Sequence, residues 1–100
     1  MQETETSYLI HFEEWTEAWA LQKAITQNLT LDPFDWQLIH FARRFYQEHH
    51  LMPLTRRLIK FIRENLNPDF DSIALQQRYT DKPLRVIALI AGLPKPIQCI

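Results

Sequence analysis

The sequence lacks the residues on which several classes of chemistry depend. It has one cysteine, Cys99, which excludes an intramolecular disulfide and a cysteine-cluster metal site. It has one glycine, Gly92, which excludes the glycine-rich loops that hold phosphate groups in many nucleotide-binding enzymes. Its apolar runs are far shorter than the roughly 20 residues that span a bilayer, so no transmembrane helix is expected.

A secretory signal is also not expected. The first residues, Met1–Glu5, are acidic and polar, whereas a signal begins with basic residues and continues with an apolar stretch. We therefore expect a cytoplasmic protein. Its 100 residues, 46% of them hydrophobic, provide for one globular domain.

The net charge of −1 hides an uneven distribution. Residues 1–42 carry seven acidic residues and one basic residue, whereas residues 43–100 carry ten basic and five acidic residues. An acidic first part and a basic second part can steer a polar partner. Solvated helix faces explain the same charge distribution more simply. The isoelectric point of about 6.4 argues against a general affinity for nucleic acid.

Apolar residues recur at spacings of three and four, which predicts a compact, mainly helical domain over residues 1–91. Asp32 and Pro33 are typical of an N-cap and a first helical residue, and Pro53 opens another helix in the same way. The alternation of Tyr8, Ile10 and Phe12 is consistent with a short N-terminal strand or hairpin over Thr6–Phe12. The predicted helices cover approximately residues 13–29, 33–49, 53–66, 70–79 and 83–91.

Other polar residues favour structural interpretations. Arg56, Lys60 and Arg63 follow one another by four and three positions, which predicts a basic ridge on the outer side of the third helix. His49 and His50 are adjacent, so they point to different faces and fit a role at a helix end better than a shared metal. We expect no metal site and no catalytic carboxylate pair.

The most informative segment follows Ala91. Gly92 suits the left-handed residue that ends a helix, and Pro94 and Pro96 favour an extended chain. At about 3.1 Å per residue, an arm over residues 92–100 carries Cys99 about 20 Å from Gly92. A lone cysteine is often a small buried hydrophobe, but a cysteine beside a chain end is exposed.

An exposed thiol on an arm suits visits to the active sites of other proteins. A fixed nucleophile would need a base and an oxyanion hole around it, and neither can be assigned to a free tail. Lys95 would favour the thiolate form of Cys99 where the arm folds back.

The segment Ile90–Ile100 resembles the C-terminus of the DsrC/TusE family of sulfur carriers. Leu31–Trp36 resembles the second helix of that family, and Pro53, Arg56 and Lys60 resemble the next one. The resemblance runs from about Tyr8 to the end of the sequence. It implies a helix-turn-helix-like core with a mobile C-terminal arm.

The resemblance also implies a function. Cys99 would carry sulfane sulfur as a persulfide, and Arg56 and Lys60 would lie where the retracted arm docks. No metal or organic cofactor is implied. One branch of the family has a further cysteine eleven positions before the penultimate one. Here the penultimate cysteine is Cys99 and the earlier position is Ala88, so the single-cysteine TusE branch fits better. The segment Tyr79–Pro83 departs from the family pattern before the last helix.

The implied partners are a TusBCD-like sulfur donor and an MnmA-like tRNA 2-thiouridylase, with no contact to DNA or membrane. Two alternatives remain open. One is a DsrC-like partner or regulator of sulfur metabolism that lacks the second cysteine. The other is a helix-turn-helix DNA-binding protein whose basic residues face phosphates, namely Arg56, Arg57, Lys60 and Arg63.

Overall fold

Helices make up the regular structure of the described part of the chain, which in this computed structural model is Tyr8 and residues 11–96. This part contains no strand. The elements are the 3₁₀ helix η2 (Phe12–Glu14) and the α-helices α1 (Glu17–Thr26), α2 (Pro33–His49), α3 (Thr55–Asn65), α4 (Ser72–Tyr79) and α5 (Pro83–Ala91). The predicted mainly helical fold is confirmed.

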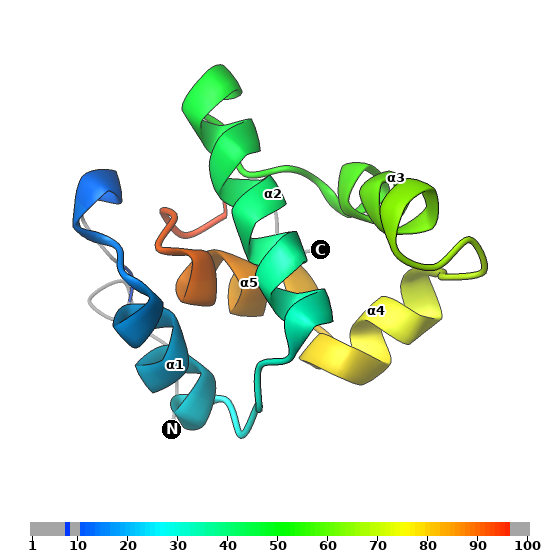
Figure 1. Cartoon of the computed structure of the whole chain (residues 1–100), viewed down its shortest axis with the longest axis horizontal. Coiled ribbons are helices and arrows are strands. Elements are labelled where there is room, and N and C mark those ends of the chain that lie inside the picture. Colours follow the sequence, from blue (N-terminus) through cyan, green and yellow to red (C-terminus); the bar gives the residue numbers. More distant parts are fainter. Residues whose placement is uncertain (1–7, 9–10, 97–100) are drawn as a thin grey trace.

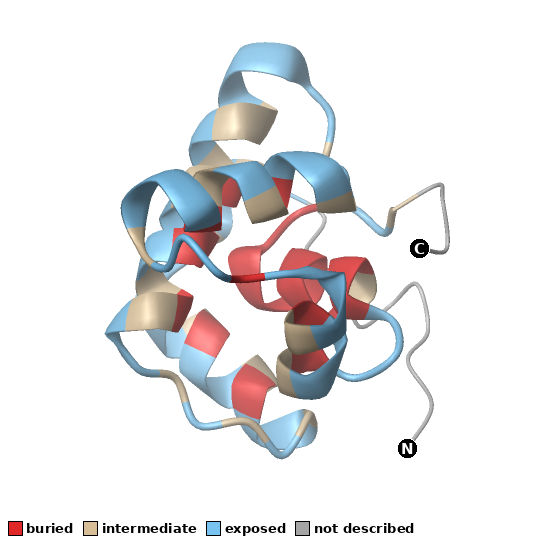
Figure 2. Cartoon of the chain, turned by 90° about the vertical axis from the view of Figure 1, so that its right-hand side faces the viewer, coloured by how far each residue is buried: buried red, intermediate tan, exposed pale blue. Residues whose placement is uncertain are grey.

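The last helix, α5, is the centre of the core. Of its nine residues only Arg85 is not buried. A helix that is apolar on all sides is stable only when other elements surround it. α1, α2 and α4 pack against α5, and α3 packs against α2 and α4 (Figure 1). The buried residues gather along α5 and on the inner faces of its neighbours (Figure 2).

The first helix is shorter than its apolar stripe predicted. The residues from Phe12 to Glu14 form η2, and α1 begins only after Thr16, whose hydroxyl accepts a hydrogen bond from the backbone amide of Trp19 at 3.1 Å. A capping threonine of this kind fixes the start of a helix. The helix ends before Asn28, whose φ of 56° lies in the left-handed region.

The second helix begins and ends as predicted. Asp32 caps it by accepting from the amide of Asp35, and the Asp35 carboxylate accepts from the amide of Asp32 in return. His50 ends the helix with a φ of 57°. The third helix begins at Thr55 rather than Pro53, because Leu54 is extended and Pro53 is buried in the core instead.

The expected N-terminal strand falls mostly outside the described residues. Of its three alternating residues, Tyr8 and Phe12 are described: Tyr8 is buried and Phe12 belongs to η2. His49 is the last residue of α2 and its ring contacts that of Phe45 at 4.4 Å, in agreement with a place at the helix end. No cluster of metal-ligating side chains occurs among the described residues.

A buried ion pair joins the start of α2 to the end of α4. Asp35 is only 1% exposed, and it accepts hydrogen bonds of 2.9 Å from Arg78 and a further one from the hydroxyl of Tyr79. Burial, together with the neighbouring Asp35 carboxylate, raises the pKa of Tyr79 well above its usual range. The hydrogen bond with Asp35 raises the pKa of Arg78 as well. The local sequence pattern does not identify this pair, because Arg78 lies 43 positions from Asp35.

In the described part of the chain, none of the helices has both the length and the apolar content to cross a bilayer.

Candidate functional site

The backbone at the end of α5 fixes where the arm begins. Gly92 has a φ of 70°, in the left-handed region where glycine carries no steric penalty. The amide of Leu93 donates to the carbonyl oxygen of Ala88 at 2.9 Å, and the amide of Gly92 donates to that of Leu89 at 3.4 Å. These bonds form a Schellman motif, and the buried Leu93 side chain anchors it in the core.

Three side chains complete the cap of α5. Trp19 Nε1 donates to the carbonyl oxygen of Leu89 at 3.0 Å, and Trp15 Nε1 donates to that of Ile90 at 2.8 Å. Arg43 Nη1 donates to the carbonyl oxygen of Ala91 at 2.7 Å. The last four carbonyl groups of a helix have no partner within the helix. Here all four carbonyl groups have donors, so the last turn of α5, from which the C-terminal segment continues, is fully hydrogen-bonded.

Arg43 links three parts of the molecule. Besides Ala91 on α5, its Nη2 donates to the carbonyl oxygen of Phe12 at 3.0 Å. Its guanidinium group lies over the rings of Phe12 and Trp15, with centroid distances of 3.9 and 4.4 Å. Burial lowers the pKa of Arg43, yet an arginine remains cationic at any working pH. Nothing in the local sequence indicates this role, because the partners of Arg43 lie 31 and 48 positions away.

The chain becomes exposed at Pro94. Pro94 and Lys95 are exposed and Pro96 is half-buried, whereas Gly92 and Leu93 belong to the packed body. The division into a body over residues 1–91 and an arm over residues 92–100 stays a prediction. Solvent exposure begins at Pro94, two residues after the predicted start of the arm. Cys99 lies outside the described residues.

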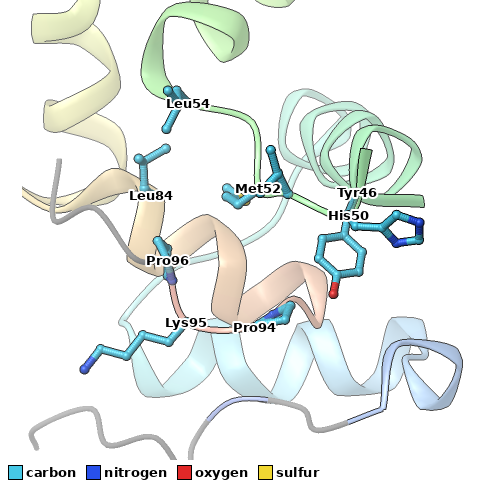
Figure 3. Close-up of a pocket in the computed structure, with 9 residues that line it drawn as sticks. Tyr46, His50, Met52, Leu54, Leu84, Pro94, Lys95 and Pro96 are labelled. Atoms are coloured by element: carbon cyan, nitrogen blue, oxygen red, sulfur yellow. The ribbon is translucent and has the colours of Figure 1, made fainter. Parts of the chain in front are cut away.

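A groove of about 360 Å³ runs beside this exposed segment (Figure 3). Pro94, Lys95 and Pro96 line one part of it. The remainder is formed by the end of α2, the connection to α3 and the start of α5, namely Tyr46, His50, Leu51, Met52, Leu54 and Leu84. Most of these side chains are apolar. The groove therefore offers an apolar surface directly before the segment that leads to the thiol.

The predicted supporting residues occupy two different places. Arg56 and Lys60 are exposed on α3 and, with Arg63, line a separate shallow hollow of about 710 Å³. Lys95 lines the groove beside the arm, and neither α3 cation lines that groove. The structure thus brings Arg56 and Lys60 together but assigns Lys95 to another hollow.

The position of the second family cysteine is closed to chemistry with solvent. Ala88 is fully buried within α5, and its carbonyl oxygen accepts the hydrogen bond from Leu93 described above. The described part of the chain therefore offers no second thiol, and Cys99 is the only thiol in the sequence.

Comparison with known proteins places these features in a family. A family model described as "DsrC like protein" matches residues 1–100. The chain is 35% identical to the sulfurtransferase TusE of Sodalis glossinidius, covering 93% of this chain and 87% of that protein. It is 37% identical to the sulfurtransferase TusE of Photorhabdus laumondii, covering 99% and 93% of the two chains.

A solved structure shares the same fold. The solution structure of DsrC from Allochromatium vinosum superposes with a TM-score of 0.81 at 31% sequence identity, covering 96% of this chain and 87% of that protein. Since the family model matches the whole length and the relatives share more than 30% of their residues, this chain belongs to the DsrC-like family.

Proposed function

We propose that this protein is a sulfur carrier that holds sulfane sulfur on Cys99 as a persulfide. It accepts the sulfur from a TusBCD-like donor and passes it to an MnmA-like tRNA 2-thiouridylase, in the cytoplasm. The observation that carries the proposal is that the chain becomes exposed at Pro94 and Lys95, just after the fully capped end of α5 and a few residues before Cys99, the only thiol of the sequence. The family membership and the names of the relatives agree with it.

The transfer step needs no outside oxidant or reductant. The thiolate of Cys99 attacks the outer sulfur of a persulfide on the donor. A new sulfur–sulfur bond forms to Cys99 while the bond between the two donor sulfurs breaks. The electron pair of that broken bond leaves with the donor sulfur as a thiolate. Atoms, charge and oxidation level are therefore conserved, and Cys99 ends as a persulfide.

Basic side chains support this chemistry electrostatically. A positive charge near a thiol favours the thiolate form, which is the nucleophile. Lys95 is four residues from Cys99 along the chain, and Arg56 and Lys60 form an exposed cationic pair on α3. We infer that Lys95 favours the anionic form of Cys99 and of its persulfide, and that Arg56 and Lys60 attract the persulfide anion when the arm folds back.

Intact-mass spectrometry tests the proposal. After incubation with a persulfide-loaded donor complex, the protein should gain about 32 Da, one sulfur atom bound as a persulfide. Cys99→Ser should abolish the gain. A protein that gains no mass, or a serine variant that gains as much as the wild type, would contradict the proposal.

A DNA-binding function draws on the same exposed α3 cations. A phosphate-binding face loses affinity steeply as salt concentration rises. Titration of a duplex DNA at several salt concentrations should show only weak binding, and Cys99→Ser should leave that binding unchanged. Tight, salt-sensitive binding would favour the DNA-binding alternative instead.

A further inference from the structure

A pair of exposed leucines borders the groove beside the arm. Leu51 and Leu54 are 61% and 47% exposed, although both lie in the short connection between α2 and α3. Fully burying a leucine side chain is worth roughly 1.5–3 kcal/mol. A molecule that covers both residues would therefore gain binding energy that the isolated protein does not use.

The reach of the chain dictates what covers this surface. Cys99 follows Pro96 by three residues, and an extended chain spans at most about 3.3–3.6 Å per residue. The Cys99 backbone is thus within about 11 Å of Pro96, which itself lines the groove. A partner whose reacting sulfur meets Cys99 must approach the surface around Pro96, and that surface includes the groove.

The charge of the groove defines the partner further. No carboxylate is among the described residues that line it. The ammonium group of Lys95 points away from the apolar lining (Figure 3), and neither of the ion pairs within the described residues involves Lys95. A partner surface with an apolar side chain beside a carboxylate would match both the apolar lining and the ammonium group of Lys95.

We propose that this groove is the docking site for the partner proteins of the relay, which insert an apolar side chain beside Leu51 and Leu54 and place a carboxylate against Lys95. The inference rests on the function proposed above. Because Pro94–Pro96 forms one wall of the groove, a docked partner also holds the start of the exposed segment and directs Cys99 towards its own active site.

The test compares two exposed apolar pairs. Leu51→Ser with Leu54→Ser alters the groove. Leu21→Ser with Ile25→Ser alters α1, where these residues are 50% and 74% exposed, and serves as the matched control. Initial rates of sulfur transfer from a purified, persulfide-loaded TusBCD-type complex are measured against carrier concentration. The groove variant should raise KM about tenfold or more with little change in kcat, as a loss of docking energy predicts.

A second donor separates docking from chemistry. Inorganic polysulfide needs no docking surface, so wild type, groove variant and control should all accept its sulfur at equal rates. Lys95→Glu should raise KM for the protein donor as well. Equal KM values for the groove variant and the control, in proteins with unchanged melting temperatures, would overturn the proposal.

The remaining outcomes are distinct. If wild-type protein accepts sulfur from neither donor, the proposed function fails, and the docking proposal fails with it. If the groove variant makes Cys99 of the isolated protein react faster with iodoacetamide, the groove holds the chain's own residues 97–100 instead of a partner. If KM changes only when tRNA is present, the groove serves RNA. Either result overturns the assignment to a protein partner.

Discussion

Single polar side chains hold this small protein together at two places. Asp35 binds α2 to α4 through Arg78 and Tyr79, and Arg43 binds the end of α5 to α2 and to the N-terminal segment. Asp35 is buried, and Arg43 is partly buried and donates to the carbonyl oxygen of the buried Ala91. The loss of one partner therefore leaves a buried polar group unsatisfied, which costs more than a surface contact.

Replacement of Arg43 should destabilise the fold. In Arg43→Met the buried carbonyl oxygen of Ala91 loses its donor, and an unsatisfied buried group costs about 1–3 kcal/mol. The carbonyl oxygen of Phe12 still accepts from the amide of Trp15 at 3.4 Å. Arg44→Met, at the exposed neighbouring position, should change the free energy of unfolding by no more than about 0.5 kcal/mol. Urea denaturation measures both. Equal effects for the two variants would mean that the contacts of Arg43 contribute little.

The Tyr79 hydroxyl makes stability depend on alkaline pH. Its pKa in the folded protein is raised, so its contribution is complete below the ordinary tyrosine value of about 10 and declines as pH rises above it. One extra proton released on unfolding lowers stability by up to about 1.4 kcal/mol per pH unit. Tyr79→Phe should show a shallower alkaline decline in urea denaturation. A slope identical to that of the wild type would contradict this prediction.

Among the helices, α5 and α3 have opposite characters. All residues of α5 except Arg85 are buried, and its last four carbonyl groups accept hydrogen bonds from backbone amides and from the side chains of Trp15, Trp19 and Arg43. α3 buries Leu58 and Ile62 and turns its basic residues to solvent. α5 therefore stabilises the fold, and α3 offers a charged surface for binding.

The glycine that ends α5 should be difficult to replace. Gly92→Ala puts a Cβ atom into a left-handed conformation, at a cost of about 1–2 kcal/mol. Gly92→Asn should cost less, because asparagine tolerates this conformation. Thermal denaturation of both variants checks the order. An alanine variant as stable as the asparagine variant would show that the helix end relaxes without penalty.

The exposed cations of α3 should affect transfer more than folding. Arg56→Ala and Lys60→Ala remove solvent-exposed charges, so stability should change by no more than about 0.5 kcal/mol. Sulfur transfer from the donor complex should slow, because the persulfide anion loses its attracting charges. Reduced stability with unchanged transfer rates would assign both residues to the fold alone.

For the molecule as a whole, the packed body ends just before the exposed residues Pro94 and Lys95. The buried residues from Tyr8 to Leu93 form one cluster, whereas Pro94 and Lys95 are already exposed. On the function proposed above, such a division would let the thiol of Cys99 reach a partner without a rearrangement of the packed body.

Removal of the last residues tests this division. Deletion of Cys99 and Ile100 should leave the melting temperature nearly unchanged while it abolishes sulfur uptake. A change of 1 kcal/mol would shift the melting temperature of a domain of this size by about 4–8 °C, so a small effect is measurable. A drop of that size or larger would mean that these residues pack against the body.

Local rules of sequence determined the family, the helical class of the fold and several helix ends, whereas the extent of the arm stays a prediction. Asp32, Pro33, Pro83 and Gly92 mark helix ends through capping and backbone geometry, which depend on near neighbours, and the mainly helical fold and the DsrC-like family are confirmed. The roles of Cys99, Arg56, Lys60 and Lys95 stay predictions.

Only the tertiary structure decided which distant residues meet. Arg43 lies 48 positions from Ala91, Trp15 lies 75 from Ile90, and Asp35 lies 43 from Arg78. A periodic pattern gives the face of a helix but not the neighbour that this face meets. The caps of α5, the buried Asp35 pair and the groove beside the arm exist only because five short helices pack around one another.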